Sequence, residues 1–403
     1  MDKKNLLILG AGHDQFPMYQ AAKKYGVRII GVDQDNGAYA RYLADRFIYI
    51  SSRDHESLIA ALQGEEIHGI ISPASDAAHQ SISILSRHYN LRYKPSLPAA
   101  QASENKRVFL TQAPHAGVRV PRHYAGSDFA EFTYHADKIG YPVVVKPVDS
   151  SGSKGISFVR AKGEMRQAFE KARQFSYRKQ VVAEEYIEGG HYSAEVFRID
   201  SQTFFAAISK KIHTGPPNFI SIGHIIPAPL TEMVERKALR QLDALCDFFE
   251  IDNGPVNFDF VISSDTITFI EMGARLAGNG IPRLITECYQ IDSYELALRC
   301  ILNELPSPLI QPVCRQYAAL QVVYAKSAGK LTEINGAMEK LKGHPAFKEI
   351  VMFKKPGDFV SEFNFSSSKL GYVVSAHPDL AVVENFMKLF ENENIFGVSA
   401  GDR

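Results

Sequence analysis

Short apolar runs alternate with amphipathic stretches through the first hundred residues of this chain. An apolar run of about four to eight residues favours a buried strand, whereas apolar residues three and four apart favour a helix. The first helical pattern covers residues 16–25 and ends before Gly26, a residue type that commonly terminates helices. The predicted strands are residues 6–9, 27–32, 47–50 and 69–72. Strands that alternate with helices in this way indicate a parallel α/β unit over residues 1–102.

The first predicted strand leads into a glycine turn, Gly10-Ala-Gly12, and the second ends at Asp33. These features also occur in the dinucleotide-binding fingerprint, but Gln15 stands at the position of its third glycine. A dinucleotide-dependent oxidoreductase therefore remains an alternative, and the turn of an ordinary doubly wound sheet is the better interpretation. Asp76 follows the fourth strand, at the edge where open α/β sheets bind ligands. We expect it either to line a substrate pocket or to cap the next helix.

A lysine followed by a flexible loop is the most informative feature of the next segment. Ser103 is expected to cap a helix that carries Lys106 in its first turns. Further on, the apolar strand 143–145 ends in Lys146 and continues into Ser150-Ser-Gly-Ser-Lys-Gly155. Backbone N–H groups of such a loop can surround phosphate oxygens, because glycine permits a close approach. The lysine precedes the glycines, which differs from the G-x-x-x-x-G-K-[ST] loop and from the kinase loop. A plain surface hairpin is the alternative.

Two later segments extend this pattern. Residues 181–187 read as a strand in which Glu184 and the main chain at Glu185 and Ile187 can hydrogen-bond an adenine ring between aliphatic side chains. Residues 254–262 and 267–275 read as a β-hairpin. Asp259 and Glu271 can face each other there, and two adjacent carboxylates are stabilised by a cation such as Mg²⁺, which prefers oxygen ligands. A hairpin with solvated acids is the alternative.

In this order, these elements resemble the ATP-grasp superfamily over about 300 residues. The resemblance implies a mixed α/β and α+β protein with a Rossmann-like pre-ATP-grasp domain at 1–102, an ATP-grasp domain at 103–305 and a small α+β domain at 306–403. The lid would cover about 127–177. The usual Glu-x-Asn-x-Arg is here Glu271-Met-Gly273-Ala-Arg275. Loss of that asparagine, with Arg275-Leu-Ala-Gly278-Asn279 following, resembles the L-amino-acid ligases of the carboxylate–amine ligase branch.

The resemblance also implies cofactors and roles for individual residues. ATP and Mg²⁺, with Mn²⁺ as a possible substitute, would be the cofactors, and Arg275 and Lys146 would serve catalysis. Asp259 and Glu271 would hold the metal. The residues assigned to ATP are Lys106, Lys146, Ser151, Gly152, Ser153, Gly155, Glu184, Glu185, Ile187 and His191. Those assigned to substrate are Arg275, Asp76, His213, His224 and Gly278.

The implied reaction forms an amide bond through an acyl phosphate, with release of ADP and phosphate. The acceptor pocket is expected in a Pro/Gly-rich loop over 210–229 that carries His213 and His224. Lys210 and Lys211 are expected only to be solvated. The alternatives are an ATP-grasp ligase for another carboxylate, carbamoyl or carboxy-phosphate chemistry, and a nucleotide-binding protein without turnover.

Composition narrows the class of protein. Lys+Arg and Asp+Glu number 45 each, so no bulk basic field favours nucleic acid. The four cysteines lack C-x-x-C spacing and fit reduced thiols, and no apolar run is long enough to span a membrane. We therefore expect a cytoplasmic enzyme with small-molecule carboxylate and amine substrates, no nucleic-acid or membrane partner, and a possible homodimer.

Overall fold

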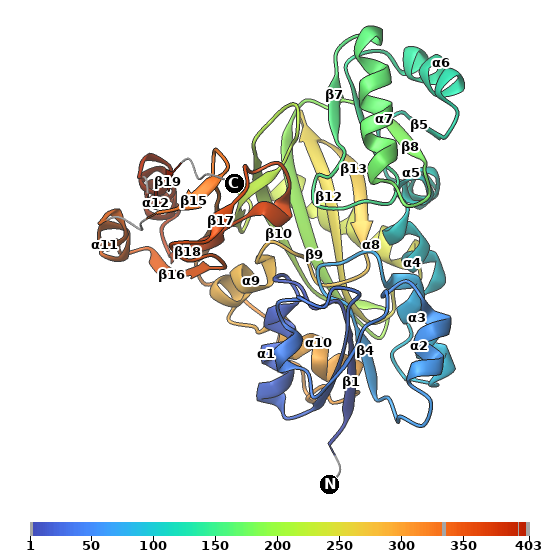
Figure 1. The fold of residues 1–403 in the computed structure, drawn as a ribbon, viewed down its shortest axis with the longest axis vertical. Coiled ribbons are helices and arrows are strands. Elements are labelled where there is room, and N and C mark those ends of the chain that lie inside the picture. The colour runs from blue at the N-terminus through green and yellow to red at the C-terminus, as the bar shows by residue number, and fades with distance from the viewer. Residues whose placement is uncertain (1–2, 333–335, 394, 400–403) are drawn as a thin grey trace.

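The computed structural model describes residues 3–332, 336–393 and 395–399. Figure 1 shows an N-terminal sheet at one end, a small sheet with two helices at the other, a long sheet between them, and a C-terminal region at its side. No helix within these described ranges combines the length and apolar character needed to cross a membrane.

Four parallel strands form the N-terminal sheet, in the order β3-β2-β1-β4. Leu6 to Leu9 are completely buried, as the continuous apolar run predicts. The elements are β1 (Asn5–Leu9), α1 (Phe16–Tyr25), β2 (Arg28–Val32), η1 (Arg41–Leu43), β3 (Arg46–Ile48), α2 (His55–Ala61), β4 (Gly69–Ile71) and α3 (His79–His88). The carboxyl ends of β1 and β4 lead into the segments that carry Asp14 and Asp76.

A separate antiparallel sheet, ordered β5-β8-β6-β7, carries Lys146 on β6 and Glu184 on the neighbouring β8. The Ser150–Gly155 loop connects β6 to β7. Helices α6 and α7 pack on this sheet through a small apolar core that includes Phe132 and Phe169. The elements are β5 (His123–Gly126), α6 (Phe129–Ile139), β6 (Val143–Pro147), β7 (Ser157–Val159), η3 (Lys162–Glu164), α7 (Met165–Phe175) and β8 (Val181–Glu185).

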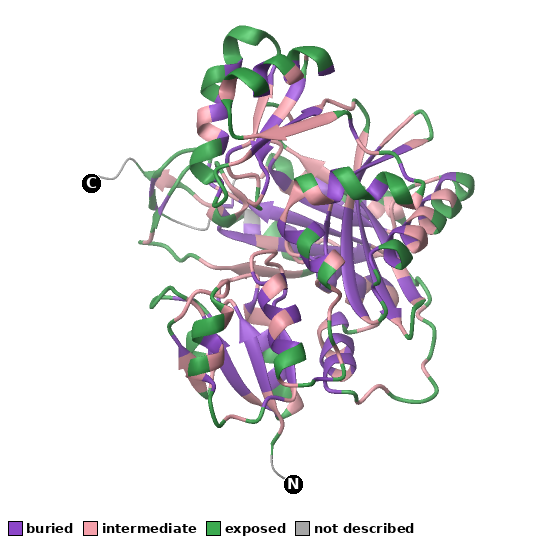
Figure 2. Ribbon diagram, turned by 90° about the vertical axis from the view of Figure 1, so that its right-hand side faces the viewer, coloured by how far each residue is buried: buried purple, intermediate pink, exposed green. Residues whose placement is uncertain are grey.

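An eight-stranded sheet forms the centre, in the order β13-β12-β9-β10-β11-β14-β18-β16. Its strands are largely buried (Figure 2). The sheet continues across position 306, so strands from both sides of that predicted boundary share one ladder. The elements up to that point are β9 (Gly190–Ile199), β10 (Gln202–His213), β11 (Ser221–Ile226), α8 (Glu232–Phe248), β12 (Gly254–Ser263), β13 (Thr266–Gly273), α9 (Ile281–Tyr289) and α10 (Ser293–Ile301).

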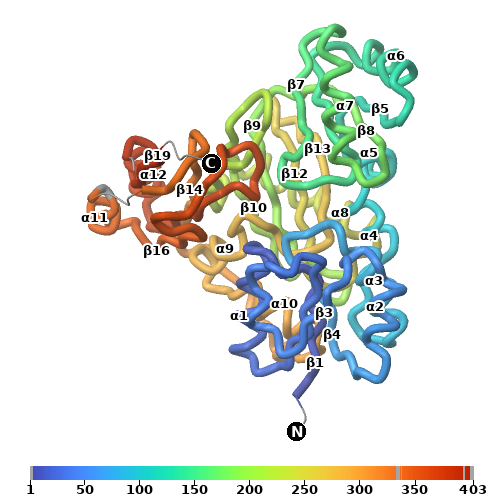
Figure 3. The backbone as a smooth tube through the Cα atoms, viewed as in Figure 1, coloured from blue at the N-terminus to red at the C-terminus, as the bar shows by residue number. Residues whose placement is uncertain are grey.

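The C-terminal region adds three strands to the central sheet and forms a small sheet of its own, β17-β15-β19. Its path lies beside the central strands (Figure 3). The elements are β14 (Tyr317–Val323), β15 (Gly329–Leu331), α11 (Ala337–Lys342), β16 (Phe347–Met352), β17 (Phe359–Val360), η4 (Ser366–Ser368), β18 (Gly371–His377), α12 (Leu380–Asn392) and β19 (Val398–Ser399).

Two local expectations are wrong. The helix near residue 103 is divided into α4 (Leu97–Glu104) and α5 (Lys106–Gln112), which is followed by η2 (Ala113–Ala116). Asn105 caps α5, because its side chain accepts from the N–H of Arg107, whereas the Ser103 hydroxyl donates within α4. Half of the expected loop over 210–229 is strand, since β10 continues to His213 and β11 covers Ser221–Ile226.

Candidate functional site

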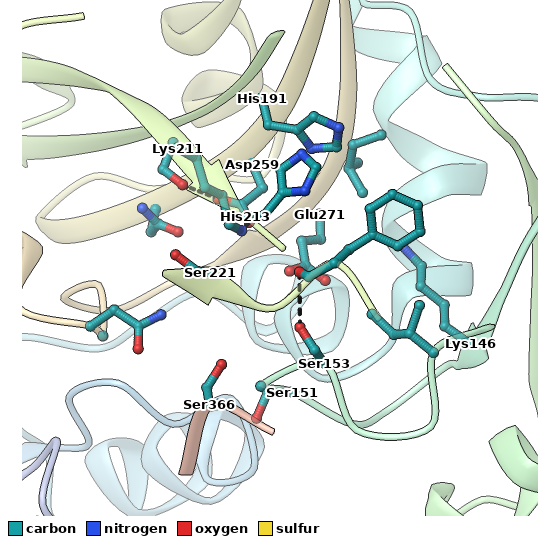
Figure 4. Close-up of a pocket in the computed structure, with 18 of the residues that line it drawn as sticks. Lys146, Ser151, Ser153, His191, Lys211, His213, Ser221, Asp259, Glu271 and Ser366 are labelled. Atoms are coloured by element: carbon teal, nitrogen blue, oxygen red, sulfur yellow. Dashed lines mark hydrogen bonds and ion pairs between the residues drawn. The ribbon is translucent and has the colours of Figure 1, made fainter. Parts of the chain in front are cut away.

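A cavity of about 310 Å³ lies between the small sheet and the central sheet. Strands β6 and β8 line it on one side, and β9, β10, β12 and β13 line it on the other. All the site residues proposed from the sequence line this cavity except Gly155. Figure 4 shows side chains from both sheets and from the Ser150–Gly155 loop pointing into the same space.

The Ser150–Gly155 loop, called the phosphate loop below, has a glycine-dependent conformation. Gly152 and Gly155 have φ values of +69° and +75°, a region that favours glycine. A Cβ on Gly155 would lie 2.9 Å from Pro147 Cγ, so Gly155 shapes the loop without lining the cavity. The Lys106 ammonium donates to the Ser150 carbonyl at 2.7 Å, which fixes the start of the loop.

Lys146 forms a buried ion pair with Glu184 on the neighbouring strand. Their nitrogen and oxygen atoms are 2.8 Å apart, and both side chains are about 95% buried, at 6% and 4% exposure. Glu184 Oε1 is also buried and has no hydrogen-bond partner among the described residues. Glu185 instead pairs with Arg122, and its N–H donates to the Arg122 carbonyl. Glu184 therefore offers an acceptor to a ligand, whereas the N–H of Glu185 is already engaged.

Asp259 and Glu271 are direct partners in the β12–β13 ladder, beside a β-bulge. Lys211 Nζ lies 2.6 Å from Asp259, and Lys106 Nζ lies 3.1 Å from Glu271. Burial alone would raise the pKa of Glu271, but the cations of Lys106, Lys146 and Lys211 outweigh it and lower that pKa to about 2. Both carboxylates line the cavity with an ammonium group beside each, which suits a site for a metal–phosphate complex.

No cluster of three or more His, Cys, Asp or Glu side chains in the described parts of the chain is arranged to hold a metal ion. The two facing carboxylates are nevertheless a sufficient protein contribution for Mg²⁺, which typically takes one or two carboxylates and completes its shell with phosphate and water oxygens.

Arg275 pairs with Asp76 across the cavity, at 2.9 Å. Arg275 lies just after β13, whereas Asp76 follows β4 of the N-terminal sheet. A Cβ on Gly273 would lie 2.8 Å from both Arg275 Cζ and Asp76 Oδ1. The ion pair therefore occupies the space that the usual asparagine side chain would need at position 273.

Three histidines that line the cavity have lowered pKa values. His191 and His213 lie 4.3 Å apart between ring centroids, near Phe219 (Figure 4). Burial is the main cause that lowers their pKa values, to about 4 for His191. Burial also lowers the pKa of His224 to about 3; its two ring nitrogens lie 3.1 Å from the hydroxyls of Ser209 and Ser221. These rings are neutral near pH 7.

Several residues that line the cavity were not predicted from the sequence. Lys211 is not merely solvated: alternation along β10 leaves Lys210 exposed and turns Lys211 toward Asp259. Asp14, Ser366 and Ser367 also line the cavity, although they come from opposite ends of the chain. Only the Lys211 alternation was visible in the sequence, once residues 210–213 are recognised as strand.

The glycine turn after β1 is not available for a dinucleotide. The Ala11 N–H donates to the Asp33 carboxylate at 2.9 Å, and the Gly12 N–H donates to the Gln15 side chain at 2.9 Å. Two backbone donors that would face a pyrophosphate are thus used internally. This arrangement disfavours the oxidoreductase alternative.

Comparison with known proteins agrees with this geometry. Residues 139–283 match the family described as ATP-grasp domain. The chain is 26% identical over 373 residues to the formate-dependent phosphoribosylglycinamide formyltransferase of Prochlorococcus marinus (strain NATL1A), covering 88% of this chain and 89% of that protein. Another relative, 24% identical over 327 residues, is longer, and the chain covers 66% of it.

Two solved structures share the fold over nearly the whole chain. The L-amino acid ligase from Bacillus licheniformis superposes with a TM-score of 0.83 at 18% identity, and the match covers 100% of both chains. The biotin carboxylase domain of the Hydrogenobacter thermophilus 2-oxoglutarate carboxylase, solved with MgADP, has a TM-score of 0.74 at 16% identity, covering 98% of this chain and 90% of that one. At these identities the likeness establishes a common fold.

Proposed function

We propose that this chain, which carries an ATP-grasp domain, is an ATP-dependent carboxylate–amine ligase that acts on amino acids. The observation that carries this proposal is the pairing of Asp259 with Lys211 and of Glu271 with Lys106 in the cavity that the phosphate loop also lines. Carboxylates for a metal ion and ammonium groups for phosphate oxygens together suit phosphoryl transfer.

The cavity fits ATP at two points. The orphaned Glu184 Oε1, buried next to Lys146, can accept a hydrogen bond from the adenine amine. At the other end, a Cβ built on Gly152 of the phosphate loop would lie 3.6 Å from Ser366, its nearest neighbour, so the backbone is not crowded at this glycine. A loop with this glycine can bring its backbone N–H groups close to phosphate oxygens.

Asp259 and Glu271 would hold Mg²⁺. When bound, the ion would neutralise charge that develops on the transferring phosphoryl group. Lys106 and Lys211 now neutralise the same two carboxylates, and they would turn toward the phosphates when the ion is present.

The first chemical step activates the carboxylate substrate. Its oxygen attacks the γ-phosphorus of ATP, the bond to the β–γ bridging oxygen breaks, and ADP leaves with the electron pair. Lys106, once it has turned toward the phosphates, and Lys146, which its ion pair with Glu184 holds in place, would stabilise the negative charge on the phosphoryl oxygens. The product of this step is an acyl phosphate.

The second step forms the amide. A neutral amine attacks the acyl carbon, the tetrahedral intermediate expels phosphate, and the departing phosphate takes up the proton that the amine loses. The forked donors of Arg275 would hold the phosphate group of the intermediate. Its partner Asp76 fixes the guanidinium in the cavity. Closure of the small sheet over the cavity would exclude water, which otherwise hydrolyses the acyl phosphate.

The charges of the cavity favour zwitterionic substrates. Six carboxylates and five cationic side chains line it. Four of the cations pair with carboxylates, and the fifth, Lys154, lies on the phosphate loop beside the ATP site. A phosphorylated amine would bring about two more negative charges to be matched, whereas an amino acid brings none in total. This balance supports amino-acid substrates.

A phosphoribosyl amine is the second candidate substrate. It is supported by the 26% identity to the Prochlorococcus formyltransferase over 88% of the chain. The two candidates differ in one measurable property, the phosphate ester on the amine.

Release of ADP tests the proposal. Purified protein with Mg-ATP is given amino acids singly and in pairs and, separately, phosphoribosylamines with formate. We expect release only with particular amino acids and none from Glu271→Ala. Release with the phosphoribosylamine alone would establish the second candidate. No release with either set, despite binding of Mg-ATP, would overturn the ligase assignment in favour of a nucleotide sensor.

A further inference from the structure

A turn of the C-terminal region contacts the phosphate loop at the edge of the cavity. Ser366 and Ser367, in η4, line the cavity, and the Ser366 N–H donates to the Gly152 carbonyl of the phosphate loop at 3.2 Å. Ser366 lies on the side of Ser151 in Figure 4. The ring of Phe365 lies 5.6 Å from that of Phe175, which extends the same contact. The turn thus touches the part of the site that would surround the phosphates.

The same turn places a buried ammonium group against two residues that line the cavity. Lys369 is 7% exposed, and its Nζ lies 2.6 Å from Asp14 Oδ1 and 3.2 Å from Asn279 Oδ1. Asp14 and Asn279 both line the cavity, one from the N-terminal region and one from the segment after Arg275. Three distant parts of the chain therefore meet around one cation.

The backbone next to Lys369 is held in place. The Leu370 N–H donates to the Val323 carbonyl and its carbonyl accepts from the Phe353 N–H, both at 2.7 Å. The ammonium has three donors, and it makes hydrogen bonds to two side-chain acceptors within the described ranges. Asp14 is the more exposed partner, at 35% against 5% for the lysine side chain. A ligand that reaches this cation from the cavity would approach it past Asp14, which lines the cavity.

The other cations are committed elsewhere under the proposed function. Lys106 and Lys211 pair with Glu271 and Asp259, Lys146 pairs with Glu184, and Arg275 is assigned to the acyl phosphate. Lys154 lies on the phosphate loop, beside the proposed ATP site. The amino acid that supplies the amine still carries a carboxylate, and burying that group without a cation is costly. Lys369 is the cation that remains beside the cavity end formed by Asp14 and Asn279.

We propose that Lys369, with Asp14 and Asn279, forms the subsite for the α-carboxylate of the amino acid whose amine is the nucleophile. The Lys369 ammonium group binds the α-carboxylate of the amino acid, while Asp14 and Asn279 hold that lysine ammonium group in position. This inference rests on the proposed ligase function. It makes Lys369 a specificity-determining residue that the C-terminal region supplies to a site built mainly by other parts of the chain.

The test crosses an enzyme variant with a substrate variant. Lys369→Gln removes the charge and keeps much of the length. We expect the KM for the acceptor amino acid to rise about tenfold or more, the loss of a charged hydrogen bond being of that order. The KM for ATP stays unchanged. The α-carboxamide of the same amino acid should react equally well, within about twofold, with both enzymes, and Lys369→Arg should retain part of the preference for the acid.

Matched controls separate this role from a structural one. Lys388→Gln, on the exposed side of α12, should change neither KM. Equal losses with the acid and the carboxamide would mean that Lys369 only supports the fold, and no change with either would also overturn the subsite.

A binding measurement separates failure of the subsite from failure of the proposed function. Calorimetry is used to compare the amino acid with its carboxamide on the full chain with ADP bound. If wild-type protein releases no ADP but still prefers the acid, and Lys369→Gln loses that preference, the subsite stands and the ligase assignment fails. If wild-type protein turns over amino acids yet shows no preference for the acid, the subsite is wrong and the ligase assignment stands. If it neither turns over nor binds amino acids, both are overturned.

Discussion

The guanidinium of Arg275 lies 2.9 Å from the carboxylate of Asp76, and this contact joins the end of the β12–β13 hairpin to the N-terminal region. Gly273 makes the contact possible, because a Cβ at that position would lie 2.8 Å from atoms of both partners. Both partners are shielded from solvent, because the side chains of Arg275 and Asp76 are only 14% and 21% exposed. The unusual glycine and the ion pair are therefore one structural feature.

The first prediction concerns Gly273. Gly273→Ala should displace Arg275 from Asp76 and lower kcat/KM about tenfold, which corresponds to roughly 1.4 kcal/mol of lost transition-state stabilisation. Steady-state ADP release measures the effect. Gly163→Ala is the control, because a Cβ there meets nothing within 4 Å. Full activity of Gly273→Ala would mean that the ion pair has no part in turnover.

The second prediction concerns the paired carboxylates. Glu271→Gln and Asp259→Asn should each reduce ADP release by about a hundredfold or more, since each removes one of the two carboxylates that we propose hold Mg²⁺. Glu188→Gln, at an exposed position after β8, is the control and should keep wild-type activity. Thermal unfolding of each variant shows whether a loss is due to folding. Retention of activity by both hairpin variants would remove the metal site from this hairpin.

The third prediction concerns pH and His224. Burial lowers the folded-state pKa of His224 to about 3, below its ordinary value of 6.5. Below pH 6.5 this histidine is protonated in the unfolded chain but stays neutral in the folded protein. The free energy of unfolding therefore decreases as the pH falls from 6.5 toward 3. The slope is at most about 1.4 kcal/mol per pH unit. Urea unfolding at pH 7, 6 and 5 should therefore give a shallower decline for His224→Gln than for wild type. Parallel declines would mean that His224 titrates normally.

The fourth prediction concerns two thiols. The sulfur atoms of Cys288, at the end of α9, and Cys314 lie 3.2 Å apart, and the Arg315 N–H donates to the Cys288 carbonyl at 2.9 Å. Diamide, which accepts two hydrogen atoms, should oxidise this pair to a disulfide. Peptide mass spectrometry without reductant should find the linked peptides in wild type and not in Cys314→Ser. Buried Cys246 and Cys300 should remain free thiols. Linkage of either of these instead would contradict the geometry.

Local patterns predicted the parts of the fold that depend on neighbouring residues. The continuous apolar run at 6–9 and the helix at 16–25 appear as β1 and α1, because burial and helix termination are encoded within a few residues. The facing of Asp259 and Glu271 also follows from a short hairpin turn, which fixes the register of its two strands.

Features that depend on distant partners were not visible in the sequence. Serine is a common helix-capping residue, but the Ser103 hydroxyl accepts a hydrogen bond from the Ala274 N–H instead. Asn105 caps α5. Residues 210–213 appeared loop-like because of nearby glycines and prolines, yet pairing with β9 and β11 makes them strand. The meeting of Asp14 with Lys369 depends on how the ends of the chain pack, for which no local pattern exists.

Transfer of oxygen from substrate to phosphate tests the central claim most directly. An amino acid that supports ADP release is labelled with ¹⁸O in its carboxylate, and the released phosphate is analysed by mass spectrometry. If the carboxylate attacks the γ-phosphorus, the phosphate must carry one ¹⁸O and the amide product must keep the other. Unlabelled phosphate formed together with the amide would contradict an acyl-phosphate ligase, because the carboxylate oxygen would never have reached phosphorus.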